Sequence, residues 1–307
     1  MRNNTFLSLF FLLSVLPAGA FAQDDPGTVW PPDDIWMETV TYAIKDTATL
    51  QMDIYQLENH DGDPQPVMMF VFGGSFARGN RYRDYYEAYF AALTREGFTV
   101  ASIDYRLGMK DRKYGLRTFT SGLMAEAVQL AVEDLFSATN YLIDHAAEWN
   151  INPDSILTSG SSAGAITSLQ ADWVLKNRMP GSEILPDDFA YKGVIGFAGG
   201  IFSTKGAPKY SSGAPAPTLF FHGNKDRTVP YRTVRVFNIG MFTSKNLARR
   251  FRRAGYDYAL IDLDGKDHRY GSGTVMTDGL PFTEWFIDRF VRGEEGGQVE
   301  MKISEGF

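Results

Sequence analysis

The chain has 307 residues, a formal net charge of −7 and no cysteine. The lack of cysteine excludes disulfide bonds, thiol nucleophiles and thiolate metal sites. The basic residues are scattered along an acidic chain, which argues against a nucleic-acid-binding surface.

The first 22 residues have the pattern of a secretory signal peptide. A basic start at Arg2 is followed by an apolar run from Phe6 to Leu16, and Ala20-Phe21-Ala22 fits the small-residue cleavage rule. The apolar run is too short to serve as a membrane anchor. We therefore expect a secreted or periplasmic protein that begins at Gln23 and carries no integral membrane segment.

Strand patterns dominate the next part of the chain. Alternating residues at 38–43 and 49–55 predict a hairpin, and the apolar runs at 67–72 and 99–103 predict strands buried on both faces. A helix is expected between these two runs, at 82–96.

From Leu123 onward, helices and strands alternate. Helices are predicted at 123–149, 163–176, 245–253 and 282–292, and strands at 155–159, 193–197, 218–221 and 258–263. This alternation predicts an α/β fold in which helices cover both faces of a mostly parallel sheet. We expect one domain over 23–292 and a polar, flexible tail over 293–307.

The segment Gly160-Ser161-Ser162-Ala163-Gly164 fits the G-x-S-x-G pattern between a predicted strand and a predicted helix. Such a strand–turn–helix holds the central serine hydroxyl clear of the sheet. The flanking glycines remove side chains that would clash where strand and helix meet. Ser162 is therefore the candidate nucleophile.

A serine nucleophile needs a base, and an acid to orient that base. His268 follows the strand at 258–263, and loops after such strands line the sites of open α/β sheets. Asp226 follows the preceding strand and lies between Ser162 and His268 in sequence, which is the order expected in this fold. Asp267 is the rival acid, and His222 is expected to shape the Asp226 loop.

Donors for a developing oxyanion are expected after the first buried strand, in Phe72-Gly73-Gly74-Ser75-Phe76. A turn there can direct the backbone N–H groups of Gly74 and Ser75 at the substrate oxygen, and Ala163 can supply a third.

These motifs, with Ala101 to Leu107 between them, resemble the α/β-hydrolase carboxylesterases and most closely their secreted bacterial branch of feruloyl and acetyl-xylan esterases. The resemblance covers roughly residues 38–292 and implies an eight-stranded, mostly parallel sheet and no cofactor. The short stretch at 177–192 leaves room for only a minimal cap, and no clustered ligand set for a metal is visible in the sequence. The family usually has histidine at Phe72 and glycine or alanine at Ser75, so the oxyanion loop departs from its pattern.

The expected activity is hydrolysis of carboxylic esters through an acyl-enzyme, with acetyl or hydroxycinnamoyl groups on plant polysaccharides as substrates. Aromatic residues in the predicted rims suit a sugar or phenolic ring, and Phe76, Tyr114 and Phe119 are candidate contacts. Two alternatives are a serine peptidase of the prolyl-oligopeptidase type and a non-catalytic binding module on a hydrolase scaffold. The absence of a large access-limiting module argues against the first, and the complete set of three residues argues against the second.

Overall fold

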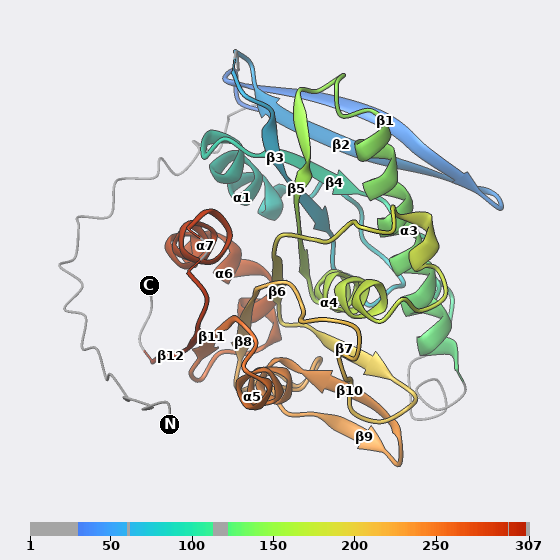
Figure 1. Cartoon of the computed structure of the whole chain (residues 1–307), viewed down its shortest axis with the longest axis vertical. Helices are drawn as coiled ribbons and strands as arrows, with labels where there is room; N and C mark the ends of the chain where they lie inside the picture. The colour runs from blue at the N-terminus through green and yellow to red at the C-terminus, as the bar shows by residue number, and fades with distance from the viewer. Residues whose placement is uncertain (1–29, 60–61, 113–121, 294, 305–307) are drawn as a thin grey trace.

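A nine-stranded sheet forms the centre of the molecule in a computed structural model that describes residues 30–59, 62–112, 122–293 and 295–304 (Figure 1). Its strand order is β1-β2-β4-β3-β5-β6-β8-β11-β12. The strands from β4 to β12 are mutually parallel, whereas β2 pairs antiparallel with both β1 and β4. The strands are β1 (Ile35–Lys45), β2 (Ala48–Leu57), β3 (Gln65–Val71), β4 (Thr99–Ile103), β5 (Ile151–Ser161), β6 (Val194–Phe197), β8 (Thr218–Gly223), β11 (Tyr258–Leu263) and β12 (Gln298–Ile303).

Helices cover both faces of this sheet, as the alternating pattern predicts (Figure 1). One face packs against α1 through the rings of Phe70 and Tyr86, whose centroids are 4.6 Å apart. The opposite face packs against α5 through Phe220 and Phe251, at 5.7 Å. The helical segments are α1 (Asp84–Arg95), α3 (Leu123–Asp144), α4 (Ala163–Lys176), η1 (Ser182–Ile184), α5 (Ser244–Ala254), η2 (Tyr270–Thr274), α6 (Val275–Asp278), α7 (Leu280–Phe286) and η3 (Ile287–Arg292).

Most predicted elements are present, and the differences fall at ends and edges. The helix expected up to residue 149 ends at Asp144. The final helix, expected as one piece at 282–292, is a series of short α and π segments from Tyr270 to Arg292. Pro281 begins a new turn within that series, because proline is compatible with the first turn of a helix but not with its interior.

The expectation of a flexible tail over 293–307 is wrong for residues 298–303, which form β12 and add a ninth strand to the expected eight. Strand β12 pairs in parallel with β11, from Gln298 opposite Tyr258 to Ile303 opposite Leu263. Its polar residues alternate with apolar ones because one face of this edge strand is exposed. The tail therefore completes the sheet.

A second, three-stranded antiparallel sheet was not expected from the sequence. It has the order β7-β10-β9 and comprises β7 (Gly200–Ser203), β9 (Val234–Val236) and β10 (Ile239–Thr243). Strand β7 follows β6 closely, and the β9–β10 hairpin lies between the Asp226 loop and α5. The small sheet thus borders the end of the large sheet at which the predicted site lies.

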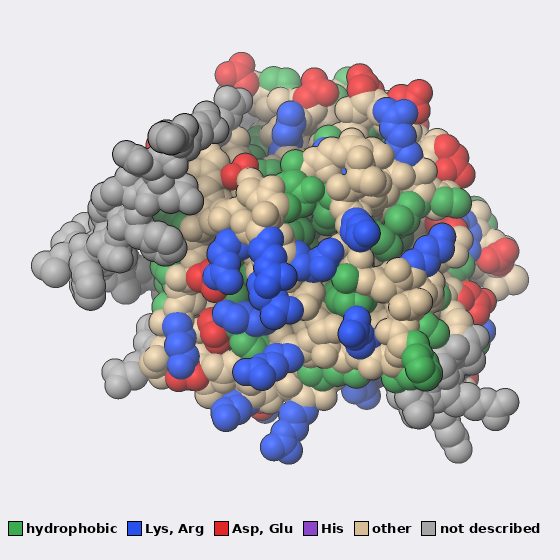
Figure 2. Space-filling model, turned by 60° about the horizontal axis from the view of Figure 1, so that its bottom comes forward, with side chains coloured by type: hydrophobic (Ala, Val, Ile, Leu, Met, Phe, Trp, Pro, Cys, Tyr) green, Lys and Arg blue, Asp and Glu red, His purple; other side chains and the backbone are tan. Residues whose placement is uncertain are grey.

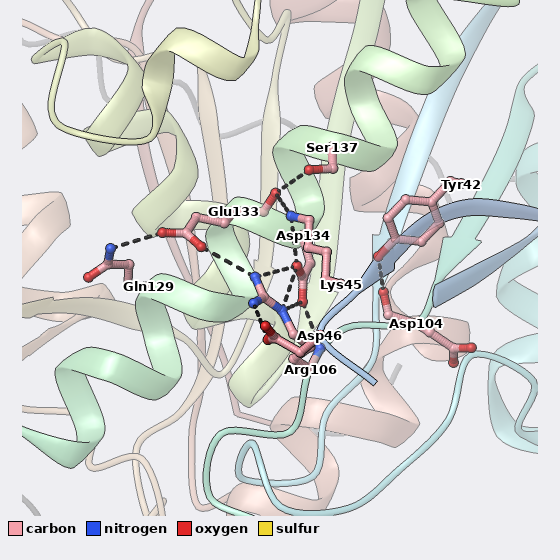
Figure 3. A network of polar contacts seen from close by, with 9 residues as sticks. All are labelled: Tyr42, Lys45, Asp46, Asp104, Arg106, Gln129, Glu133, Asp134 and Ser137. Atoms are coloured by element: carbon pink, nitrogen blue, oxygen red, sulfur yellow. Dashed lines mark hydrogen bonds and ion pairs between the residues drawn. The ribbon is translucent and has the colours of Figure 1, made fainter. Parts of the chain in front are cut away.

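A buried ion-pair network fixes the loop after β4 (Figure 3). The fully buried carboxylate of Asp134 on α3 accepts hydrogen bonds from the backbone N–H and the guanidinium of Arg106, and it lies 3.0 Å from Lys45 Nζ. Tyr42 donates to the carbonyl oxygen of Asp104 in the same loop. Breaking a buried pair of this kind typically costs about 3–5 kcal/mol. The motif from Ala101 to Leu107 is therefore a structural tie between the β1–β2 hairpin and α3.

Basic side chains gather on one face of the molecule, on the side of α5 (Figure 2). The expectation of scattered basic residues is thus wrong at the level of the surface, although the expectation of no nucleic-acid partner stays a prediction. Glu300 pairs with Lys245 and Arg252, whereas no carboxylate pairs with Arg249 or Arg253 among the described residues. No helix in the described part of the chain is long and apolar enough to cross a membrane.

Candidate active site

The nucleophile turn forms where β5 meets α4. Ser162 has φ 52° and ψ −111°, a conformation that is strained for a residue with a side chain. Its backbone N–H donates to the carbonyl oxygen of Phe197 at the end of β6, which holds the turn in place. Ser162 is 8% exposed, so only a small part of this residue reaches solvent.

The two glycines of the motif are required by close backbone contacts. A Cβ at Gly160 would lie 2.4 Å from the backbone carbon of Gly164, and a Cβ at Gly164 would lie 1.8 Å from the carbonyl oxygen of Val71. Neither contact can be relieved by rotating a side chain, because the opposing atoms are backbone. The glycines therefore allow β3, β5 and α4 to meet, as the sequence predicts.

The structure brings the three predicted residues into one hydrogen-bonded chain. Ser162 Oγ lies 2.9 Å from His268 Nε2, and His268 Nδ1 lies 2.7 Å from Asp226 Oδ2. Since an ionised carboxylate can only accept, Nδ1 carries the proton that it donates to Asp226, and Nε2 of the neutral ring accepts from the serine hydroxyl.

The Asp226 carboxylate is held by its own loop. Its Oδ1 accepts hydrogen bonds from the backbone N–H groups of Thr228 and Val229, at 2.8 and 2.9 Å. Burial favours a raised pKa for Asp226, but hydrogen bonds from His222 and His268 outweigh burial and hold its pKa at about 2. The side chain is therefore a carboxylate throughout the neutral range.

The remaining histidines and the rival acid have other contacts. His222 is fully buried, donates from Nε2 to the carbonyl oxygen of Val229 and lies 2.8 Å from Ser244 Oγ through Nδ1, so it shapes the Asp226 loop as expected. Asp267 accepts from the N–H of Tyr270. His145 stacks on Tyr141 at the end of α3, and His60 lies outside the described residues.

The predicted oxyanion loop passes directly over the nucleophile turn. A Cβ on Gly73 would lie 2.9 Å from the carbonyl oxygen of Ser161 and 3.2 Å from Ser162 Cβ. Three consecutive residues, Gly74, Ser75 and Phe76, have positive φ values of 136°, 60° and 57°. At Gly74 a Cβ would lie 1.8 Å from the carbonyl oxygen of Arg78, so this turn requires glycine.

The N–H groups expected to bind the oxyanion have no hydrogen-bond acceptor within the described parts of the chain. This holds for Gly74 and Ser75 in the loop and for Ala163 at the first position of α4. The N-terminus of α4 adds its partial positive charge to the same place. Their role as oxyanion donors stays a prediction.

The departures at Phe72 and Ser75 have different consequences. Phe72 is buried and stacks on Tyr105 with a centroid separation of 4.4 Å, and the Tyr105 hydroxyl donates to the carbonyl oxygen of Phe72. The Phe72–Tyr105 pair therefore fixes the start of the oxyanion loop. Ser75 adopts a left-handed conformation that favours glycine, which stores backbone strain next to the site.

One of the three predicted substrate contacts is buried, and the other two are not described by the structure. Phe76 is 1% exposed and packs against Tyr105, so it is a core residue and the expectation of a substrate contact is wrong. Tyr114 and Phe119 lie outside the described residues.

A cavity of about 520 Å³ that was not anticipated lies between α1 and the segment after His268. Its lining includes Tyr85 from α1 together with Arg269, Ser272, Thr274, Thr277 and Asp278. The rule that loops after parallel strands line the site points to residues directly after His268 and could have identified Arg269. Tyr85 could not be identified in that way, because it belongs to a helix distant in sequence.

Comparisons with known proteins agree on the fold. The esterase 2 of Thermogutta terrifontis, solved after phosphonylation by cyclosarin, superposes with a TM-score of 0.61 at 21% identity, covering 86% of this chain and 97% of that one. The same esterase with bound butyrate gives a TM-score of 0.60 at 20% identity, with 85% and 97% covered. The fold is that of the α/β-hydrolases.

Several relatives that match in sequence are named as esterases. A family model described as BD-FAE matches residues 52–178, which is less than half of the chain. A probable isoprenylcysteine alpha-carbonyl methylesterase from Arabidopsis thaliana is 24% identical over 256 residues, which is 71% of this chain and 48% of the relative. The fumonisin B1 esterase of Sphingopyxis macrogoltabida is 24% identical over 153 residues, which is 48% of this chain and 28% of the relative. The chain thus spans about half the length of the first relative and less of the second.

Within the described residues, no group of three or more acidic or histidine side chains is arranged to hold a metal ion. The polar side chains around Ser162 are instead engaged with one another and with backbone N–H groups. This arrangement can transfer a proton from a hydroxyl to an imidazole and back.

Proposed function

We propose that the protein is a serine carboxylic-ester hydrolase that removes acetyl or hydroxycinnamoyl groups from plant polysaccharides. The observation that carries the proposal is the chain of hydrogen bonds from Ser162 through His268 to Asp226, at 2.9 and 2.7 Å. The similarity to a family of esterases over residues 52–178 supports the same reaction class.

In the first half of the reaction, Ser162 Oγ attacks the ester carbonyl while its proton passes to His268 Nε2. The imidazolium that forms is stabilised by the Asp226 carboxylate across the 2.7 Å contact. Negative charge on the former carbonyl oxygen is met by the N–H groups of Gly74, Ser75 and Ala163. The tetrahedral intermediate then expels the alcohol, which takes the proton from Nε2 and leaves an acyl group on Ser162.

In the second half, His268 removes a proton from water and the resulting hydroxide attacks the acyl carbonyl. A second tetrahedral intermediate forms in the same oxyanion site. It collapses with return of the proton to Ser162 Oγ, and the carboxylic acid leaves. Overall, ester and water give alcohol and acid, and the protein is regenerated.

The substrate class rests on the resemblance and on the polar rim of the site. The signal-peptide pattern of residues 1–22, which lie outside the described residues, supports export to a compartment where such polymers occur. Between α4 and β6 the chain has only residues 177–193, with the short η1 as their one helical segment, which is little chain for a cap.

The test is a substrate series with matched variants. Acetyl, octanoyl and palmitoyl p-nitrophenyl esters, methyl ferulate, acetylated xylan and a proline-containing peptide are compared by kcat/KM. We expect hydrolysis of the acetyl ester, methyl ferulate and acetylated xylan, and a kcat lowered by on the order of 10⁶ in Ser162→Ala. Ser161→Ala serves as the control. Rates that climb with acyl length to palmitoyl, or efficient peptide cleavage, would refute the substrate class, and full activity of Ser162→Ala would refute the mechanism.

A further inference from the structure

The cavity between α1 and residues 269–278 is connected to the predicted catalytic residues and the oxyanion loop at three places. Arg269, in its lining, directly follows His268. The carbonyl oxygen of Ser272, also in the lining, accepts a hydrogen bond from Ser161 Oγ, next to the nucleophile. Residues of the lining are thus joined to the neighbours of both Ser162 and His268.

The third contact runs through α1. The Tyr85 hydroxyl lies 3.0 Å from that of Tyr86, and the Tyr86 hydroxyl accepts from the N–H of Gly73 in the oxyanion loop. Tyr85 thus lines the cavity at one side and is linked to the oxyanion loop at the other. The Tyr86 ring lies 4.3 Å from that of Tyr85, and the Arg83 guanidinium lies 6.0 Å from the centre of the Tyr85 ring. Tyr85 is nevertheless 47% exposed, so part of its surface is open to a ligand.

The lining places several polar groups beside an aromatic ring. Besides Tyr85, Ala88 and Gly273, it presents the hydroxyl-bearing residues Ser272, Thr274 and Thr277 and two charged residues of opposite sign. A few placed polar groups beside an aromatic ring suit a polyhydroxylated ligand. The volume of about 520 Å³ lies within the ordinary range for small-molecule sites.

The charges favour a neutral ligand with several hydroxyl groups. Arg269 offers only donors and has no ion-pair partner among the described residues, whereas Asp278 offers only acceptors. One Asp278 oxygen, Oδ2, accepts from the Tyr270 hydroxyl at 2.7 Å, so the other can accept from a ligand. Because the two formal charges cancel, an anion gains little here, while neighbouring sugar hydroxyls can accept from the arginine and donate to the aspartate.

We propose that this cavity is the subsite for a neutral sugar ring that carries the scissile ester, with Arg269 and Asp278 bonding its hydroxyl groups and Tyr85 stacking on its face. This inference rests on the proposed ester hydrolysis and adds to it the place and the residues that select the alcohol part of the substrate.

The test compares methyl 3-O-acetyl-β-D-xylopyranoside with p-nitrophenyl acetate as substrates, using the ratio of their kcat/KM values. Losing a hydrogen bond to a charged group costs about 1.5–3 kcal/mol, so Arg269→Gln should lower the ratio roughly 10- to 150-fold, mainly through KM. Tyr85→Ala should lower it as well, and Tyr85→Phe should restore it. Arg253→Gln, an exposed arginine on α5, is the matched control and should leave the ratio unchanged.

A binding measurement separates this inference from the proposed reaction. Methyl β-D-xylopyranoside should bind the Ser162→Ala protein in a titration followed by NMR, and Arg269→Gln should weaken that binding by a similar factor. A ratio and an affinity that are both unchanged in Arg269→Gln would overturn the sugar subsite while leaving esterase activity intact. Binding of the sugar without hydrolysis of either ester would instead overturn the proposed function.

Discussion

A buried carboxyl group behind the nucleophile should make the stability of the protein depend on pH. Asp172 lies on α4 and is 1% exposed; its Oδ1 accepts from the N–H of Ala216, and the Tyr210 hydroxyl lies against the same carboxyl group. Burial raises the pKa of Asp172 from 3.8 to about 7, against the opposing effect of the Ala216 hydrogen bond. The residue ties the segment before β8 to α4.

The sign of the effect follows from which state releases the proton first. The unfolded chain ionises near pH 3.8 and the folded chain only near 7, so the unfolded state binds fewer protons between these values. Stability contributed by the protonated carboxyl is complete below pH 3.8 and is lost as the pH rises through 7. The full loss is about 4 kcal/mol, of which about 2–3 kcal/mol falls between pH 5 and pH 8.

The variant Asp172→Asn removes the titration and keeps an oxygen to accept from Ala216. Urea unfolding followed by tryptophan fluorescence at pH 5 and pH 8 gives the free energy of unfolding of both proteins. The free energy of unfolding of the variant, minus that of the parent, should increase by about 2–3 kcal/mol from pH 5 to pH 8. Asp187→Asn, at an exposed position, is the control and should show no such increase. A difference between Asp172→Asn and the parent that is constant with pH would refute the reasoning.

Three further predictions concern the reaction. Asp226→Asn should lower kcat for p-nitrophenyl acetate by about 10⁴, because it destabilises the required tautomer of His268 and the imidazolium. The control Asp267→Asn should leave kcat within about twofold. Comparable losses of kcat in both variants would reassign the acid. Gly74→Ala should lower kcat by about 10²–10³, since its Cβ meets the Arg78 carbonyl oxygen and displaces the donors, and an unchanged rate would remove Gly74 from the oxyanion site. A histidine base acts only when neutral, so kcat/KM should fall as the medium is made acidic, and an optimum near pH 4 would point to a carboxylate base instead.

The elements around the nucleophile could be predicted from the sequence because local signals and packing agree there. Helix α4 and strands β4 and β11 have the predicted bounds. Continuous apolar runs identify strands buried on both faces, and the glycines on either side of Ser162 are needed for the strand–helix contact. The order of serine, aspartate and histidine then selects one candidate for each position.

Edge elements gave weaker signals. Strand β12 alternates Val299, Met301 and Ile303 with polar residues, a period of two that was masked by the neighbouring glycines and charges. Strand β9 has three residues and is paired only within the small sheet, so its formation depends on β10 rather than on its own sequence. Whether such segments form strands depends on the strands they pair with.

Side-chain environments were the least predictable part. Nothing local distinguishes the buried Phe76 from an exposed rim aromatic, because its burial depends on Tyr105 from another loop. The same is true of Tyr85, which lines the cavity only because α1 lies beside the segment after His268. Chemistry-bearing residues can thus be assigned from motifs, whereas substrate contacts require the fold.

The most direct measurement of the central claim is mass-spectrometric mapping of the residue that reacts with an organophosphate such as paraoxon. The hydrogen-bonded chain at Ser162 predicts one phosphoryl adduct per molecule, located on Ser162, with p-nitrophenyl acetate hydrolysis lost in proportion to labelling. Labelling should be abolished in Ser162→Ala, strongly slowed in His268→Ala, and retained in Ser161→Ala. An adduct on Ser161 would contradict the account. So would full hydrolytic activity in Ser162→Ala, or inactivation by paraoxon without an adduct on Ser162.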